Sequence, residues 1–367
     1  MVISKSKPFL IIGGGLMGLS IAHQLSRNGC KVEILSRRRR EAAGFVAAGM
    51  LAPHAEGLQN TMLEIGQLSL HKQSCWVKQI EDDSGMSCGL RNCGIIVPFV
   101  NYSTCDNYPT RQFGTNLTRK ELEQEIPELA SKWKVGLLFN QDGQIDNRRL
   151  LMRALENACF KLGVKFQEGV EVLELIQTSK VFQGVRIRNA EGEIKTIKGK
   201  EAVLCSGAWS NQLMKELPVF PVKGQMLSIQ GPKNTLKRVI FGPGTYLVPR
   251  EDGLIIVGAT SERKSFFNEG LTPEGQSKLR DGLQSIIPNA TSWPHMERWW
   301  GFRPCTPDEC PILGMSAIEG LWLATGHYRN GVLLAAITSE LLKKSILKEP
   351  LNNQEHELLT AFRWDRF

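Results

Sequence analysis

The hydrophobic positions near the start of the chain predict a strand, a helix and a second strand. Phe9 to Ile12 form a short, uninterrupted apolar run, which is typical of a buried parallel strand. Apolar residues from Leu16 to Leu25 then recur with mixed spacing on a predicted helix, which Gly29 ends. A second apolar run covers 32–35. The pattern therefore predicts a β-α-β unit.

Three glycines between the first strand and the helix have the spacing G-x-G-x-x-G. Gly13 permits a tight turn, Gly15 lets a pyrophosphate approach the backbone, and Gly18 allows the helix to pack closely on the strand. The phosphates would bind to the free amides at the start of the helix. This spacing, placed between two strands, predicts a dinucleotide site. A glycine-rich turn without a ligand is the alternative.

The second strand ends in an unexpected residue. Units of this kind usually carry Asp or Glu there, about 20 residues after the first glycine, to hold the ribose hydroxyls. Ser36 occupies this place and is followed by arginines at 37–40, while Glu33 points elsewhere by alternation. The arginines could neutralise the extra phosphate of NADP, contact other cofactor phosphates, or form an exposed charged run.

The middle of the chain continues with helices and strands. A strand is predicted over 92–100, and Thr118 to Glu121 has the form of a capping box for a short helix that ends near Pro127. The apolar run 202–205 leads into Gly207, as Ile12 leads into Gly13. Amphipathic spacing and alternation predict further elements: helices over 61–80 and 146–162, and strands over 164–176, 181–189 and 194–198.

The region from about 221 to 300 has a different character. Strands follow one another over 223–230, 244–249 and 254–259, with a hairpin turn at 251–253, before a helix that starts at Thr272 and Pro273. Successive strands without helices between them predict an antiparallel sheet, hence a second domain.

A third strand ends in a glycine near the end of the chain. Leu321 to Gly326 repeats the earlier pattern and precedes a helix over 330–342. Three such endings predict three loops at the carboxyl edge of one parallel sheet, where α/β folds bind ligands.

Composition narrows the class of protein. A chain of 367 residues suggests two domains that can enclose a ligand. The formal charge of +8 includes the four arginines at 37–40, and the other basic residues are scattered, which argues against nucleic acid. No apolar stretch is long enough to span a membrane, and the start of the chain does not resemble a signal peptide. We therefore expect a soluble, cytoplasmic protein.

The nine cysteines fit a reducing compartment better than a disulfide framework. Four residues separate Cys88 from Cys93 and Cys305 from Cys310, which is wider than the usual spacing of zinc ligands. We therefore interpret these cysteines as structural thiols and expect no metal.

Several motifs, taken together, resemble one family. They resemble the FAD-dependent amine oxidases of the D-amino acid oxidase and sarcosine oxidase group, and within it the glycine oxidase branch of thiamine biosynthesis. The resemblance covers nearly the whole chain. The motifs occur in order as Gly13 to Gly18, Ala48 to Glu56, Ser206 to Ser210, Trp300 to Pro304 and Gly326 to Gly331.

The resemblance implies an α/β fold with two domains. A Rossmann-type FAD-binding domain would be built from 1–85, 145–217 and 299–367, and a largely antiparallel α+β substrate domain from 86–144 and 218–298. It also implies a homo-oligomer, either a dimer or a tetramer.

The resemblance also implies a reaction. Glycine and molecular oxygen would give hydrogen peroxide and the imine of glyoxylate, which serves thiazole formation or hydrolyses to glyoxylate and ammonia. The alternatives are sarcosine or a small D-amino acid as the substrate, a dehydrogenase that passes electrons to a quinone, and a nucleotide-binding regulatory protein without catalysis.

Three residues receive roles in the reaction by resemblance. Arg303 would bind the substrate carboxylate through two parallel hydrogen bonds, with an inter-domain salt bridge as the alternative. Tyr246 would hydrogen-bond the same carboxylate. Arg329 would lie near the pyrimidine end of the flavin, or be a solvated charge at a helix start.

The remaining implications concern the cofactor. The position of the flavin-attaching cysteine of sarcosine oxidases falls near Gly301, so FAD would be bound without a covalent link. Met50 would pack on the ring or the substrate. His54 and His327 are interpreted as structural, because hydride transfer needs no acid or base. The residues that the resemblance places around FAD are Gly13, Gly15, Leu16, Met17, Gly18, Ser36, Arg37, Ala48, Gly49, Met50, Val172, Ser206, Gly207, Trp209, Arg303, His327, Arg329, Asn330, Gly331, Val332 and Leu333.

Overall fold

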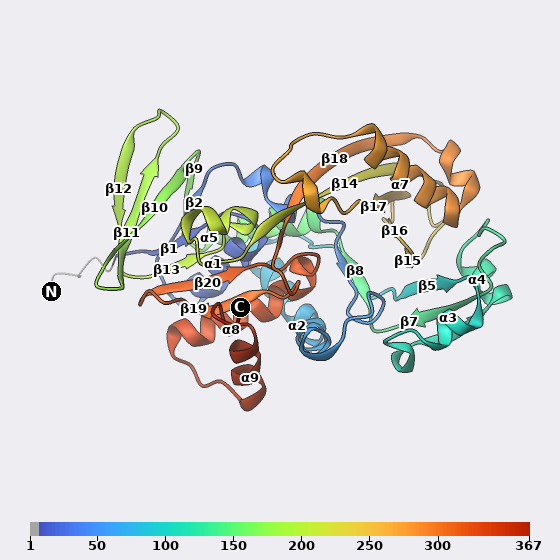
Figure 1. Ribbon diagram of the computed structural model, residues 1–367, viewed down its shortest axis with the longest axis horizontal. Coiled ribbons are helices and arrows are strands. Elements are labelled where there is room, and N and C mark those ends of the chain that lie inside the picture. Colours follow the sequence, from blue (N-terminus) through green and yellow to red (C-terminus); the bar gives the residue numbers. More distant parts are fainter. Residues whose placement is uncertain (1–6) are drawn as a thin grey trace.

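A six-stranded sheet forms the centre of one half of the molecule (Figure 1). The computed structural model describes residues 7–367. The strand order is β19-β20-β13-β1-β2-β9, and every neighbouring pair is parallel except β19 with β20. The strands are β1 (Phe9–Ile12), β2 (Val32–Ser36), β9 (Lys165–Glu168), β13 (Ala202–Leu204), β19 (Ile312–Met315) and β20 (Leu321–Thr325).

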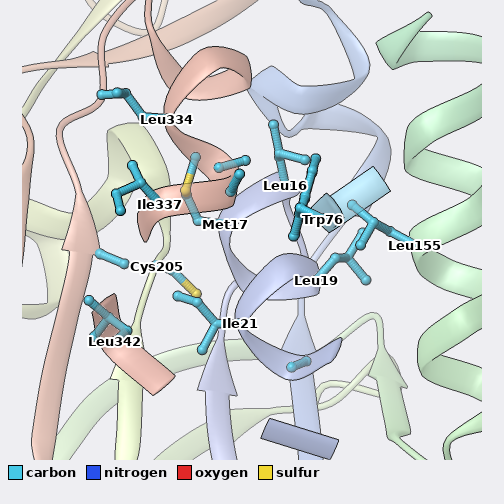
Figure 2. Close-up of a cluster of buried hydrophobic side chains, with 14 of the residues drawn as sticks. Leu16, Met17, Leu19, Ile21, Trp76, Leu155, Cys205, Leu334, Ile337 and Leu342 are labelled. Atoms are coloured by element: carbon cyan, nitrogen blue, oxygen red, sulfur yellow. The ribbon is translucent and has the colours of Figure 1, made fainter. Parts of the chain in front are cut away.

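Helices pack on one face of this sheet. Ile11 and Ile34 point into the core that these helices share, whereas the alternate residues Leu10 and Leu35 belong to the core on the opposite face. Figure 2 shows α1 at the centre of the helical core, with Trp76 and Leu155 on one side and α8 on the other. The helices are α1 (Leu16–Arg27), α2 (Asn60–Ser84), α5 (Met152–Lys161) and α8 (Gly331–Leu347), with α9 (Asn353–Ala361) next to α2.

A small antiparallel sheet covers the opposite face of the parallel sheet. It consists of β10 (Glu171–Thr178), β11 (Val181–Arg188) and β12 (Ile194–Lys198), and it projects at the left in Figure 1. The single strand expected over 164–176 is therefore wrong. Gly169 has φ +74°, and this left-handed residue separates β9 of the parallel sheet from β10 of the antiparallel one.

An eight-stranded sheet forms the other half, in the order β18-β14-β17-β16-β15-β5-β7-β6. All its neighbouring strands are antiparallel except β15 with β5, which confirms the predicted change of sheet type and adds one parallel pair. Its strands are β5 (Ile95–Phe99), β6 (Thr115–Thr118), β7 (Val135–Phe139), β14 (Phe220–Gln230), β15 (Val239–Gly242), β16 (Thr245–Pro249), β17 (Leu254–Gly258) and β18 (His295–Cys305).

Helices accompany this second sheet as well. Leu279 and Leu283 of α7 pack with Leu122 of α4 in the core on one of its faces. The predicted capping box is present, because Thr118 and Glu121 cap α4 reciprocally. The helices are α3 (Tyr102–Asp106), α4 (Arg119–Glu125) and α7 (Pro273–Ile286).

A further sheet of three short strands includes the end of the Ala-Gly-Met-Leu motif. Its strands are β3 (Met50–Leu51), β8 (Gly143–Ile145) and β4 (Leu90–Arg91), with β8 in the middle. The predicted boundary between 298 and 299 falls inside β18, so one continuous strand belongs to both predicted domains. The five-segment division itself stays a prediction.

Several predicted helix limits differ in detail from the structure. The helix expected over 146–162 begins with a π-helical turn, Asn147–Leu151, and Asp146 caps it by accepting a hydrogen bond from the Arg149 amide. The helix expected over 61–80 continues to Ser84, because the left-handed residue that ends it is Gly85. The short helix α6 (Ser210–Leu213) follows β13. None of the helices within residues 7–367 is both long and apolar enough to cross a membrane.

Candidate functional site

A cavity of about 430 Å³ lies at the carboxyl ends of β1, β13 and β20. The three strands are parallel, so the residues that follow them, Gly13, Ser206 and His327 among others, meet at one edge of the sheet. Tyr246 of β16 and Arg303 of β18 line the same cavity from the eight-stranded sheet. The predicted edge site is therefore enclosed by both halves of the molecule.

The glycine motif has the geometry that its spacing predicts. Gly13 has φ +120°, and a Cβ atom there would lie 2.5 Å from the Cys205 carbonyl oxygen. A Cβ atom at Gly18 would lie 1.9 Å from the Gly13 oxygen, so Gly18 permits close packing and does not itself line the cavity. Gly15 precedes α1 without a side-chain cap, and Leu16 and Met17 line the cavity. The first amides of α1 are thus available to an anion.

A second helix begins at the same cavity. The side chain of Asn330 does not cap α8, and the helix residues Gly331 and Val332 line the cavity. Asn330 and Leu333 do not line it; the Leu333 side chain is buried in the core, and its carbonyl accepts a hydrogen bond from Ser69. Two helix N-termini, each with a partial positive charge, therefore border one cavity.

His327 lines the cavity and is buried. Its Nε2 lies 3.1 Å from the Thr338 hydroxyl oxygen, and its Nδ1 has no partner within residues 7–367. Burial lowers the pKa of His327 to about 3. The imidazole is therefore neutral at physiological pH.

The end of the cavity near β2 explains the arginine run. Ser36 is buried, and the Arg37 guanidinium lies over the Trp209 ring at 5.3 Å. Glu41 pairs with Arg37 at 3.3 Å and with Arg38 at 2.9 Å. Three of the four arginines have carboxylate partners, because Arg39 binds Glu156 and Glu168 at 2.6 Å each. Glu41 lines the cavity and is an acidic group that the sequence analysis did not identify.

The small-residue motif contributes backbone to the cavity wall. Gly49 has φ +91°, and a Cβ atom there would lie 1.9 Å from the Ile145 carbonyl oxygen. The Ala48 carbonyl accepts a hydrogen bond of 2.6 Å from Arg250. Met50 lines the cavity next to them, and elsewhere Ser206, Gly207 and Val172 do so too.

Arg303 and Tyr246 each lie against a glycine of the neighbouring strand. A Cβ atom at Gly224 would be 2.4 Å from Arg303 Nη1, and one at Gly258 would be 2.4 Å from the Tyr246 ring. Arg303 donates a hydrogen bond of 3.0 Å to the Thr260 carbonyl. Burial raises the pKa of Tyr246, and the nearby Arg303 charge opposes this shift, so the phenol stays protonated.

Arg329 has a carboxylate neighbour that the sequence analysis missed. Its Nη2 lies 3.5 Å from Glu56 Oε2, and its side chain is 45% exposed whereas that of Glu56 is 7% exposed. Glu56 closes the motif that begins at Ala48, but its sequence position alone gives no sign that it lines the cavity.

Comparison with known proteins identifies the family. The model of the DAO family of FAD dependent oxidoreductases matches residues 9–344. The chain belongs to this family. It is 40% identical over 369 residues to the bifunctional protein ThiO/ThiG of Synechocystis, covering 98% of this chain and 54% of that protein. The chain spans about half the length of the ThiO/ThiG relatives that it matches.

Relatives of the chain's own length are similar as well. A glycine oxidase of Bacillus licheniformis is 30% identical, with 97% of this chain and 96% of that protein covered. The crystal structure of glycine oxidase from Geobacillus kaustophilus matches with a TM-score of 0.88 and 26% identity, covering 98% of each chain. The predicted α/β fold with a largely antiparallel second sheet is confirmed.

FAD is the cofactor of this family, and the cavity fits it. Two helix N-termini without side-chain caps and the Gly13 to Gly18 motif have backbone amides that would suit the pyrophosphate and the flavin. The cavity continues between them and Ser36, Arg37 and Trp209, where the adenosine would lie. Gly301 lines the cavity and has no thiol, so the position singled out for a covalent link cannot form one. NADP binding was one interpretation of the arginines at 37–40, but the cofactor of this family is FAD.

The cysteines form no disulfide bonds within residues 7–367. All nine are free thiols, and Cys88 and Cys305 are buried. Within residues 7–367, no group of three or more His, Cys, Asp or Glu side chains could hold a metal ion.

Proposed function

We propose that the protein oxidises glycine with molecular oxygen. Glycine loses two electrons and two protons to give the imine of glyoxylate, and oxygen gains them to give hydrogen peroxide. The observation that carries this proposal is the placement of Arg303 and Tyr246 together in the FAD cavity, each over a glycine that leaves it room. Relatives named glycine oxidase support it.

Arg303 and Tyr246 orient the substrate. The guanidinium binds the substrate carboxylate through two parallel charge-assisted hydrogen bonds, and the neutral Tyr246 hydroxyl donates a third. The carboxylate would thereby be fixed in the cavity, which leaves the α-carbon free to face the flavin. The chemistry that FAD supplies when bound is the acceptance of a hydride.

The two helix N-termini serve the cofactor. The amides of α1 would hold the pyrophosphate, and Ser36, Arg37, Val172 and Trp209, which line the cavity, would surround the adenosine. Arg329 and the start of α8 would stabilise negative charge at the pyrimidine end of the flavin. His327 stays neutral, and His54, held between Asp142 and Gln67, does not line the cavity, so we assign neither of them a role as acid or base.

The product and its setting belong to the same proposal. The imine serves thiazole formation, as the resemblance to the glycine oxidase branch of thiamine biosynthesis implies, or hydrolyses to glyoxylate and ammonia. Nine free thiols fit the reducing cytoplasm, where we place the reaction. We also propose that the protein acts as a homo-oligomer, which light scattering would test.

Peroxide release from the FAD-loaded chain tests the proposed function. Glycine, sarcosine and D-alanine would be compared side by side, with the FAD-free chain as the control. Glycine should give the highest kcat/KM. A higher value for sarcosine or D-alanine would reassign the substrate. Reduction of an artificial electron acceptor without peroxide would indicate a dehydrogenase, and a chain that does not bind FAD would overturn the proposal.

A further inference from the structure

A buried carboxyl group in the cavity has no part in the function proposed so far. The side chain of Glu56 is 7% exposed, and its Oε2 has no hydrogen-bond partner within residues 7–367. It lines the cavity together with Arg303, Tyr246 and Arg329. An acceptor atom that is removed from water without a partner costs free energy, so this oxygen is poised to accept a hydrogen bond from a ligand.

The backbone around Glu56 is fixed by buried hydrogen bonds. The Ala55 amide donates to Asp142 Oδ2 at 2.7 Å, and the Tyr108 hydroxyl donates to the Ala55 carbonyl at 2.5 Å. The Thr110 hydroxyl donates to the His54 carbonyl at 2.5 Å. These bonds come from distant parts of the chain, so the fold holds the carboxyl group at a defined place in the cavity wall.

Arg329 does not satisfy the hydrogen-bonding capacity of the buried Glu56 carboxyl group. Its Nη2 lies 3.5 Å from Oε2 without forming a hydrogen bond, and its side chain is 45% exposed, so water screens the pair. The other charged or titratable groups facing Glu56 are Arg303, which attracts its charge, Asp142, which repels it, and the phenols of Tyr108 and Tyr246. None of these is a donor to Oε2.

A zwitterionic amino acid supplies what is missing. Its carboxylate would neutralise Arg303, and its ammonium group carries three donors for an acceptor that lines the same cavity. We propose that Glu56 receives the α-ammonium group of the substrate and accepts one of its protons. This inference rests on the proposed function, because it takes the carboxylate on Arg303 as given.

The transfer balances without another reactant. An N–H bond of the ammonium group breaks, an O–H bond forms on Oε2, and the electron pair stays on nitrogen, which leaves the neutral amine that hydride transfer requires. The proton exchanges with water after the product leaves. Burial raises the pKa of Glu56, while Arg329 and Arg303 oppose the shift, which brings the carboxyl closer to the amine in proton affinity than an exposed Glu.

The Glu56→Gln variant of the FAD-loaded chain tests this inference. At neutral pH, kcat/KM for glycine should fall by about 10²-fold, a typical contribution of a positioned proton acceptor. The loss should shrink as the pH rises, because free glycine then supplies the neutral amine itself. Inhibition by acetate, which has a carboxylate and no amino group, should change little, and the flavin spectrum should stay the same.

Controls separate this role from a structural one. Glu355→Gln removes another buried carboxyl group, which pairs with Lys344 far from the cavity, and should leave glycine kinetics unchanged. Glu56→Asp should recover part of the activity. An unchanged pH profile in Glu56→Gln, or an equal loss of acetate and glycine affinity, would overturn the inference while the wild-type chain still oxidised glycine. A wild-type chain inactive on glycine would instead count against the proposed function.

Discussion

The guanidinium group of Arg303 lies against the backbone of Gly224, where a Cβ atom would be 2.4 Å from Nη1. Contacts of Cβ atoms below 3.0 Å are essentially never observed, so the Arg303 guanidinium group can keep this position only while residue 224 has no side chain. The obstructed group is the far end of a flexible side chain, which can move without disturbing β14 or β18.

Gly224→Ala should therefore displace Arg303 and leave the fold intact. We expect the KM for glycine to rise by about 10-fold or more, since part of a charge-assisted pair is lost. FAD content and the midpoint of thermal unfolding should stay close to wild type. Steady-state peroxide release, with the flavin spectrum measured on the same sample, checks both. An unchanged KM would show that the position of the Arg303 guanidinium group over Gly224 is unimportant for substrate binding.

Arg303→Ala should have a larger effect on the same constant. Loss of the bidentate pair costs about 3 kcal/mol, which corresponds to a rise of about 10²-fold in KM, while FAD stays bound. Arg298→Ala is the matched control, because Arg298 is an exposed arginine on the same strand. Equal glycine kinetics in the two variants would contradict the role of Arg303.

Tyr246→Phe should weaken substrate binding modestly. The ring still fits over Gly258, and only the hydroxyl is removed, so the loss is about 1 kcal/mol, or about five-fold in KM. Tyr102→Phe, which alters an exposed tyrosine, serves as the control. A variant with wild-type KM would indicate that the hydroxyl does not contact the carboxylate.

The sequence predicts the parts of the site that depend on local geometry. Gly13, Gly15 and Gly18 are recognisable because a tight turn, a close approach and close packing each require glycine at a fixed spacing. Leu333 shows the limit of this reasoning: it lies only two positions after Gly331, yet it points into the core. Residues two positions apart in a helix point in different directions, so Gly331 lines the cavity whereas Leu333 faces the core. The sequence motif alone does not indicate this difference.

The burial of Glu56 could not be predicted from its neighbours in sequence. It depends on tertiary contacts of residues 54–56 with Tyr108, Thr110 and Asp142, which lie far along the chain. The break at Gly169 was missed for a related reason. The alternation of residues continues across Gly169. The two strands are distinguished only by their partners, because β9 pairs with β2 and β10 pairs with β11.

Glu41→Gln should weaken FAD binding. Glu41 is a cavity-lining carboxylate near Ser36, where the usual ribose-binding acid is absent, and we expect it to accept hydrogen bonds from the ribose. Since its side chain is 29% exposed, we expect a loss of only about 10-fold in affinity. Titration of the FAD-free chain, followed by flavin fluorescence, measures this. Glu174→Gln, an exposed carboxylate paired with Arg186, is the control; equal affinities would exclude Glu41 from the ribose site.

His327 should make the folded state sensitive to acid. Its pKa is about 3 when folded and near 6.5 when unfolded, so the unfolded chain binds more protons between these values. The contribution of His327 to stability is therefore complete above pH 6.5 and is lost as the pH falls toward 3. Each pH unit within this window lowers the free energy of unfolding by about 1.4 kcal/mol.

Denaturant unfolding at pH 7.5, 6 and 5, with saturating FAD, measures this effect. The free energy of unfolding should decline less for His327→Gln than for the wild type. His356→Gln, on the surface helix α9, controls for the loss of an ordinary histidine. Parallel declines in all three proteins would show that His327 does not become charged on unfolding in this range.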